Sequence, residues 1–340
     1  MIEAMLYDRC EEQYVRCHLC LWNCRIAPGK RGVCRTRENV DGTLYTLIGD
    51  RISSACLDPI EKKPLYHFHP GTQAYSIGTV GCSFKCPGCQ NWQISRGEPL
   101  EEDWRLIRMT PEESVRHAIE QGAAGICWTY NDPAIWLEFT LPGAKLAKDA
   151  GLYTVYVTNA SATHAHLDAI GPYLDAYRVD IKAFSPQAYQ KIAGFSNVEG
   201  IFDGVEYAKN RWGMHIECVT NVTPTINDSD DELRGIAHWI AESLGVDTPW
   251  HVTRFIPYEG FANLPMTPVE TLHRAVAIGQ EAGLRYVYVG NVPGDPYQDT
   301  HCPSCGDVII ERRGMALARN GVKDGRCPHC GTAIYGRFTP

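Results

Sequence analysis

The sequence lacks the features that direct a chain to a membrane or to nucleic acid. No apolar run approaches the roughly 18 residues that a membrane-spanning helix needs. Residues 1–5 place no basic region ahead of an apolar stretch, so we expect no signal peptide. The chain has no long basic block and a formal net charge of −8, which argues against nucleic acid and anionic membranes as partners. We therefore expect a soluble, cytoplasmic protein.

Cysteine, in contrast, is abundant, with 15 among 340 residues. Disulfides are typical of small secreted domains, whereas clustered cysteines in a large chain without a secretion signal indicate metal ligands. Eleven of the cysteines form three groups along the sequence: Cys17, Cys20, Cys24 and Cys34; Cys82, Cys86 and Cys89; and Cys302, Cys305, Cys327 and Cys330. Cys127 and Cys218 lie in apolar runs and are expected to be inert core residues.

The hydrophobic pattern predicts an α/β core between two cysteine-rich ends. Strand-like runs occupy 74–80, 124–129, 153–158, 176–181, 214–221, 250–255 and 285–289. Helical patterns occupy 111–121, 134–149, 163–171, 186–192, 199–211, 229–243 and 268–282. This alternation favours a parallel sheet with helices outside it, in a partial (β/α)6-type TIM barrel, with a flat doubly wound sheet as the alternative.

Three segments follow from this pattern. Residues 1–66 form an N-terminal cysteine-rich segment that binds metal, and residues 67–290 form the partial barrel. Residues 291–340 form a C-terminal four-cysteine module of the zinc-ribbon or rubredoxin-like kind. His67 and His69 are expected to pack or cap rather than bind metal.

The run Cys82-Ser-Phe-Lys-Cys86-Pro-Gly-Cys89 has the spacing C-x3-C-x2-C and follows a strand-like stretch. Three thiolates on one loop hold three irons of a [4Fe–4S] cube and leave the fourth iron open for a substrate or cofactor. The carboxyl end of a parallel strand is where α/β proteins build active sites. A three-ligand zinc site and a thioredoxin-like pair at Cys86 and Cys89 are the alternatives.

The two cysteine-rich ends predict further metal sites. Cys302-x2-Cys305 and Cys327-x2-Cys330 are paired knuckles that suit one tetrahedral zinc ion or a rubredoxin-like iron. Zinc would make this tail structural, and iron would make it an electron relay. The spacing of Cys17, Cys20, Cys24 and Cys34 is less regular, and it leaves structural zinc, an auxiliary iron–sulfur cluster and no metal as alternatives.

The central cysteine run resembles the signature of the radical S-adenosylmethionine (SAM) superfamily. The stretches 86–95, Thr129-Tyr-Asn-Asp-Pro133, Thr158-Asn159 and Val179-Asp-Ile-Lys182 resemble its pyruvate formate-lyase activating enzyme-like branch, and most closely the AmmeMemoRadiSam system enzymes. The resemblance implies that the methionyl amine and carboxylate of SAM chelate the open iron. It implies an electron transfer that cleaves SAM to methionine and a 5′-deoxyadenosyl radical, which abstracts hydrogen.

The resemblance also assigns residues to SAM. Asn131 and Asp132 follow the second strand, where an amide and a carboxylate can accept hydrogen bonds from the methionyl ammonium; an ordinary turn is the alternative. Thr158, Asn159, Asp180 and Lys182 end later strands and are further expected SAM contacts. His251 and Arg254 lie within the strand run 250–255, where both can face the pocket, and Arg254 can meet the SAM carboxylate. Asp180 and Lys182 share one strand face, and a structural ion pair is the alternative for them.

The sequence thus predicts a radical SAM oxidoreductase of the activase-like kind, with a [4Fe–4S] cluster and SAM as cofactors. It needs an external one-electron donor, such as a flavodoxin or a ferredoxin-like protein. The expected substrate is a protein or a small molecule. Besides the electron donor, the expected partner is a protein substrate or another protein of the AmmeMemoRadiSam system. A glycyl-radical-enzyme activase proper and a non-catalytic multi-metal scaffold are the alternatives.

Overall fold

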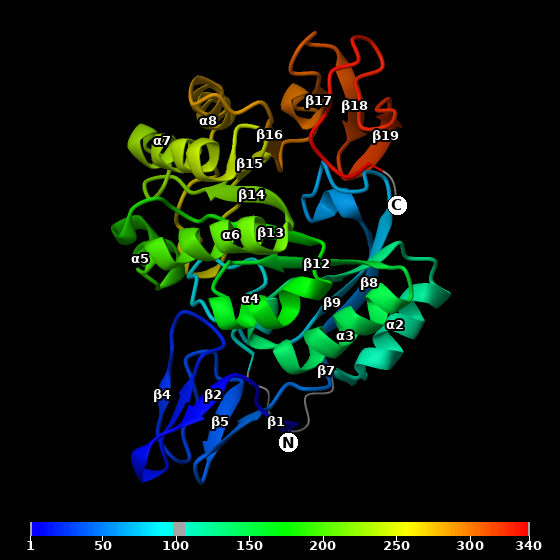
Figure 1. Cartoon of the computed structure of the whole chain (residues 1–340). Coiled ribbons are helices and arrows are strands. Elements are labelled where there is room, and N and C mark those ends of the chain that lie inside the picture. Colours follow the sequence, from blue (N-terminus) through cyan, green and yellow to red (C-terminus); the bar gives the residue numbers. More distant parts are fainter. Residues whose placement is uncertain (1, 98–105, 339–340) are drawn as a thin grey trace. The chain divides into compact units, whose positions relative to one another are not determined.

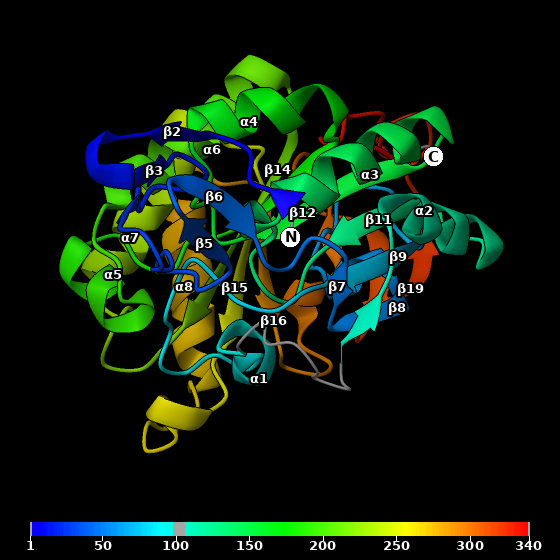
Figure 2. The same cartoon turned by 90° about the horizontal axis from the view of Figure 1, so that it is seen from below.

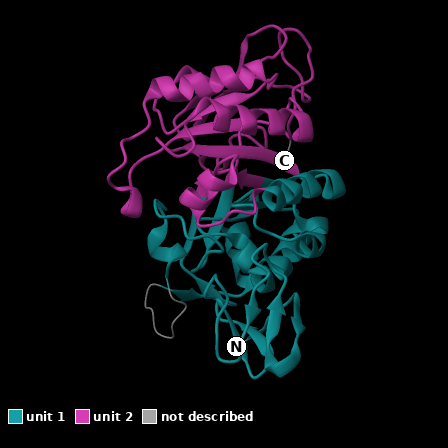
Figure 3. Ribbon diagram, turned by 90° about the vertical axis from the view of Figure 1, so that its left-hand side faces the viewer, with its two compact units in different colours: residues 1–57, 74–177, 199–214 teal, residues 58–73, 178–198, 215–340 magenta. Residues whose placement is uncertain are grey.

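Parallel strands alternate with helices from residue 73 onward, as the hydrophobic pattern predicts (Figure 1). The computed structural model describes residues 2–97 and 106–338. It divides into two compact units (Figure 3). Unit 1 comprises Met1–Leu57, Ala74–Tyr177 and Glu199–Met214, and unit 2 comprises Asp58–Gln73, Arg178–Val198 and His215–Pro340. The three segments predicted from the sequence follow a different division and stay a prediction.

In unit 1, the strand order is β12-β11-β9-β8, and β11 pairs in parallel with both β9 and β12. These strands are β8 (Ser54–Pro59), β9 (Gln73–Gly78), β11 (Gly125–Trp128) and β12 (Tyr153–Thr158). The helices of this unit are α1 (Trp92–Ser95), α2 (Pro111–Glu120), α3 (Leu137–Asp149), α4 (His164–Ile170) and α6 (Val198–Trp212). Helices α2 and α3 pack on β11 and α3 also packs on β12, which buries one face of these strands (Figure 2).

In unit 2, the strand order is β16-β15-β14-β13, and β15 pairs in parallel with β14 and β16. These strands are β13 (Ala176–Asp180), β14 (His215–Val222), β15 (Trp250–Arg254) and β16 (Val287–Gly290). The helices are α5 (Pro186–Ala193), α7 (Asp230–Trp239) and α8 (Val269–Glu281). Helix α8 packs on β15 and β16.

The small sheets are antiparallel and lie outside the parallel strands. Near the N-terminus, the sheet β1-β6-β5 comprises Ile2–Glu3, Thr43–Thr46 and Arg37–Val40, and the sheet β2-β3-β4 comprises Tyr7–Arg9, Val15–Cys17 and Arg25–Ile26. Strands β7 (Arg51–Ile52) and β10 (Ile107–Arg108) form a pair. The tail of unit 2 forms the sheet β17-β18-β19 from Thr300–His301, Val308–Arg313 and Ala316–Asn320.

Local sequence signals explain where several helices begin and end. Thr110 accepts a hydrogen bond from the Glu113 backbone, and Glu113 accepts one from the Thr110 backbone, which forms a capping box ahead of α2. Helix α5 ends at Gly194, whose φ of 69° is the left-handed conformation that glycine adopts without strain.

The predicted strands and helices are confirmed to within a few residues, and the α/β class with parallel strands is confirmed. The curling of these strands into a partial barrel stays a prediction. Among the described residues, no helix has the length and apolar character needed to span a membrane.

Candidate active site and metal centres

The three central cysteines lie on the loop that follows β9, in unit 1. Gly81 precedes the first of them with a φ of +85°, and a Cβ at this position would lie 2.3 Å from Cγ2 of Thr36. Only glycine therefore fits here, because both the backbone conformation and the space exclude a side chain. The loop contains Cys82, Cys86 and Cys89, all partly buried.

The far end of this loop is held by α1 and the residue after it. Arg96 donates hydrogen bonds to the carbonyl oxygens of Cys86 (2.9 Å) and Pro87 (2.8 Å). The Gly81 N–H donates to the carbonyl of Ile94, so both ends of the loop are fastened to the same helical turn. These hydrogen bonds fix the path of the loop at both ends.

Asp132 is the centre of a buried hydrogen-bond network beside the loop. Its side chain is almost fully buried, at 1% exposure. Oδ2 accepts from the hydroxyls of Ser83 (2.7 Å) and Ser161 (2.9 Å), and Oδ1 accepts from the hydroxyl of Thr158 (2.8 Å). Since Ser83 belongs to the cysteine loop, this carboxylate connects the loop to the ends of β11 and β12.

Two asparagines complete the support of the loop. Asn131 donates to the Gly81 carbonyl (2.9 Å) and accepts from the Thr79 N–H (3.1 Å). Asn159 donates to the Ser83 hydroxyl (2.9 Å) and lies 3.8 Å from Sγ of Cys82. The structure thus brings Asn131, Asp132, Thr158 and Asn159 together around the cysteine loop. Their predicted contacts with SAM stay a prediction.

Both strand ends that carry these residues contain a non-glycine residue with positive φ. Tyr130 has a φ of 75° and Ala160 a φ of 61°. Such conformations cost about 1–3 kcal/mol and concentrate at functional sites, where the surrounding structure enforces them. Asn131 and Asp132 follow Tyr130, and Asn159 and Ser161 flank Ala160, and all four side chains contact the cysteine loop.

The environment of Cys82 suits a metal-bound thiolate. Burial, followed by the nearby Asp132 carboxylate and Cys86, raises the pKa of the Cys82 thiol well above its usual value. A thiol in such a place stays protonated unless a cation compensates the charge of its thiolate. The residues present therefore fit an iron–sulfur cluster.

Asp180 and Lys182, in unit 2, contact each other and a third charged residue. Lys182 Nζ lies 3.1 Å from Oδ2 of Asp180, and Arg178 pairs with Oδ1. Burial by itself would raise the pKa of Asp180, but Arg178 and Lys182 outweigh it and lower this pKa to about 2. The carboxylate is therefore ionised at neutral pH, and its predicted role in binding SAM stays a prediction.

His251 belongs to a buried network around Glu217. Its Nε2 lies 2.7 Å from Oε2 of Glu217, and Nε2 of His215 lies 3.0 Å from Oε1. The backbone N–H groups of Tyr66 and His67 also donate to this carboxylate. Burial would raise the pKa of Glu217, but the two histidines lower it well below the usual range. His251, at 1% exposure, is thus an internal partner of Glu217.

Arg254, at the end of β15, donates through Nε to the Thr267 carbonyl (2.8 Å). Its own carbonyl accepts from Asn221 (3.2 Å) and Asn291 (3.1 Å). The predicted contacts of His251 and Arg254 with SAM stay predictions.

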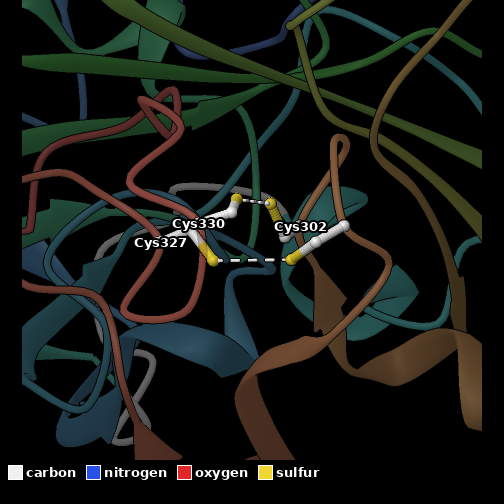
Figure 4. Close-up of side chains that lie close together, drawn as sticks. Cys302, Cys327 and Cys330 are labelled. Carbon is white, nitrogen blue, oxygen red and sulfur yellow. Dashed lines mark hydrogen bonds between the residues drawn. The ribbon is translucent and has the colours of Figure 1, made fainter.

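The four tail cysteines converge on one point (Figure 4). Sγ of Cys302 lies 3.5 Å from that of Cys330, and Sγ of Cys305 lies 3.8 Å from that of Cys327. Tetrahedral zinc with bonds of about 2.3 Å places its sulfurs about 3.8 Å apart. The group therefore fits a single tetrahedral ion, as the paired knuckles predict.

The sequence pattern did not predict three of the residues in these networks: Ser83, Ser161 and Glu217. Ser83 and Ser161 are common residue types with no spacing signal. Glu217 could have been suspected, since it is an acid between the apolar residues Ile216 and Cys218 of a strand run. His67 packs as expected: its ring contacts the Tyr335 carbonyl (2.6 Å) and the Tyr288 hydroxyl (2.5 Å).

Comparisons with known proteins agree with this site. The sequence model of the Radical SAM superfamily matches residues 76–240. The chain is 39% identical over 336 residues to the uncharacterized protein MJ0808 of Methanocaldococcus jannaschii, covering 98% of this chain and 99% of that protein. It is 23% identical over 162 residues to an isethionate sulfite-lyase activating enzyme of Oleidesulfovibrio alaskensis, covering 47% and 50% of the two chains.

A solved structure shares the fold. SuiB of Streptococcus suis, bound to the precursor peptide SuiA, matches with a TM-score of 0.50 and 12% identity, over 68% of this chain and 51% of SuiB. Together with the cysteine loop at the end of β9, the family model shows that residues 76–240 of the chain belong to the radical SAM superfamily.

Proposed function

We propose that the chain is a radical SAM enzyme in which Cys82, Cys86 and Cys89 bind a [4Fe–4S] cluster. The observation that supports this is the cysteine loop itself, held at the end of β9 with only three cysteines. When bound, the cluster supplies the electron that cleaves SAM to methionine and a 5′-deoxyadenosyl radical for hydrogen abstraction.

The residues of the chain have separate tasks in this proposal. Asn131 and Asp132 hold the backbone and the Ser83 side chain of the loop, so that the three sulfurs keep their relative positions. The partial barrel and the SAM contacts of Asp180, Lys182, His251 and Arg254 are parts of the same proposal.

We propose further that the substrate is a protein segment and that the enzyme is activase-like. The relative named as an isethionate sulfite-lyase activating enzyme supports this choice, over about half of each chain. The electron would come from an external flavodoxin or ferredoxin-like donor.

Anaerobic reconstitution with iron and sulfide, reduction with dithionite and an assay for 5′-deoxyadenosine test the proposal. We expect the native chain to form 5′-deoxyadenosine. Cys86→Ala should form it at least 100-fold more slowly, because one iron of the cluster loses its cysteine ligand. Cys10→Ala, outside all three cysteine groups, should keep the native rate.

A native chain with a verified cluster and bound SAM, yet without any 5′-deoxyadenosine, would contradict the proposal. It would favour the multi-metal scaffold instead. Product formation by Cys86→Ala at the native rate would place the reacting cluster elsewhere in the chain.

A further inference from the structure

The four N-terminal cysteines line one pocket in unit 1. Cys17, Cys20, Cys24 and Cys34 all border it, together with Arg37 and a few apolar side chains. Cys17 and Cys20 are 7% and 8% exposed. Cysteines separated by up to 17 positions in the sequence thus line one pocket, which a core without a ligand does not require.

The donors around these sulfurs suit thiolates. The backbone N–H of Leu19 donates to Cys17 and that of Trp22 to Cys20. Thr36 donates from its hydroxyl to Sγ of Cys34 (3.2 Å). Hydrogen bonds to sulfur favour its ionised form, because a thiolate is a much stronger acceptor than a thiol.

Arg37 adds a positive charge to the same pocket. It is 1% exposed, and its Nη1 lies 3.7 Å from Sγ of Cys17. Its Nη2 pairs with the buried Glu138, while its Nε, also buried, has no hydrogen-bond partner. A negatively charged group in the pocket would supply an acceptor where the guanidinium faces it.

Cys17 and Cys20 are buried, and Cys24 and Cys34 are partly buried. Several thiolates so close together in such a pocket need a multivalent cation among them.

The spacing of the sulfurs distinguishes the kinds of metal centre. Over residues 2–97 and 106–338, the tail cysteines alone form a group whose ligand atoms all lie within 4.8 Å of one another. The N-terminal cysteines do not, and neither do Cys82, Cys86 and Cys89. A single tetrahedral ion draws its sulfurs to about 3.8 Å. A cluster holds them farther apart, because several iron and sulfide atoms lie between them.

We propose that Cys17, Cys20, Cys24 and Cys34 bind an auxiliary [4Fe–4S] cluster. With four cysteine ligands, no iron is left open, so this cluster does not chelate SAM. An auxiliary cluster at the N-terminal cysteines goes beyond the proposed function, since the radical reaction requires only the cluster of the loop after β9.

The auxiliary site is built against that loop. Trp22 donates through Nε1 to the Ser83 carbonyl (2.7 Å). A Cβ on Gly81 would lie 3.0 Å from the Cys34 carbonyl, so the two cysteine segments are in close contact. The two clusters would therefore be neighbours within unit 1.

Iron, acid-labile sulfide and zinc analyses of the full-length chain, with Mössbauer spectroscopy after reconstitution with ⁵⁷Fe, test the proposal. We expect about eight sulfides and eight cluster irons per native chain, in two four-iron clusters, besides the single zinc or iron ion of the tail. The variant Cys82→Ala/Cys86→Ala/Cys89→Ala should keep about half of both, with the spectrum of a four-iron cluster.

Adding Cys24→Ala/Cys34→Ala to that variant should remove the remaining sulfide and all cluster iron, so that at most the single metal ion of the tail is left. Adding Cys305→Ala/Cys330→Ala instead is the matched control, which should lose only the metal of the tail. About four irons per native chain, or zinc bound through the N-terminal cysteines, would overturn the proposal. The native chain decides this even if a variant fails to fold. Loss of 5′-deoxyadenosine formation with eight irons present would contradict only the proposed function.

Discussion

At the scale of single residues, Asp132 acts on the cysteine loop through its hydrogen bonds. Both of its oxygens accept from hydroxyl groups, and one of these belongs to Ser83, between two of the cysteines. A carboxylate that is predicted to bind the SAM ammonium therefore also positions the loop. Binding of SAM and positioning of the loop predict different outcomes when Asp132 is replaced by alanine.

We expect Asp132→Ala to lower the iron retained by the loop and to destabilise the chain by about 1–3 kcal/mol, because three buried hydroxyls lose their acceptor. Iron content, SAM affinity and urea denaturation measure this. Asp203→Ala, whose side chain is 67% exposed, is the control and should match the native chain. Native iron content with a large loss of SAM affinity would show that the carboxylate acts on SAM alone.

At the scale of elements, strand β14 connects three segments of unit 2 through one carboxylate. Glu217 and His215 are two residues apart and so lie on the same face of the strand. His251 comes from β15, and the N–H donors come from residues 66 and 67. The tail packs on this region, because Arg312 donates to the Tyr66 carbonyl and places its guanidinium over the Tyr66 ring.

We expect Glu217→Ala to destabilise the chain by about 3–5 kcal/mol, since it leaves buried donors without the charge that they surround. Urea denaturation measures the change. Glu242→Ala, at an exposed position, should stay within about 0.5 kcal/mol of the native chain. An equally small change for Glu217→Ala would mean that water replaces the carboxylate and that the network does not hold these segments together.

At the scale of the whole molecule, buried histidines make stability depend on pH. Burial is the main cause that lowers the pKa of His166 in unit 1 and of His67 in unit 2, each to about 3. Unfolded histidine titrates near 6.5. Between pH 6.5 and 3 the unfolded chain therefore binds protons that the folded chain does not. Each site contributes its full stability above pH 6.5 and loses it as the pH falls toward 3.

Lowering the pH from 7.5 to 5.5 reduces the free energy of unfolding. We expect this reduction to be about 1.4 kcal/mol smaller in His166→Leu than in the native chain. Urea denaturation at the two pH values measures the difference. His238→Gln, at an exposed position, should show the native dependence. An unchanged pH dependence in His166→Leu would mean that the ring is already protonated in the folded chain.

The sequence by itself determined the features that depend on short spacing. Hydrophobic periodicity placed the strands and helices, and the C-x3-C-x2-C run and the paired knuckles indicated metal chemistry, because their residues are neighbours in the chain. Tertiary structure decided which distant groups meet. It placed Ser83 and Ser161 on Asp132, 49 and 29 positions away, and the backbone of residues 66 and 67 on Glu217.

Tertiary structure also decided the difference between two four-cysteine groups. Both contain the same ligand type, but the tail draws its sulfurs within 4.8 Å, while the N-terminal cysteines surround a pocket beside Arg37. The physical reason is that the distance between ligands depends on how separate strands and loops pack. Packing is a sum of contacts between residues far apart in the chain, and no local pattern records it.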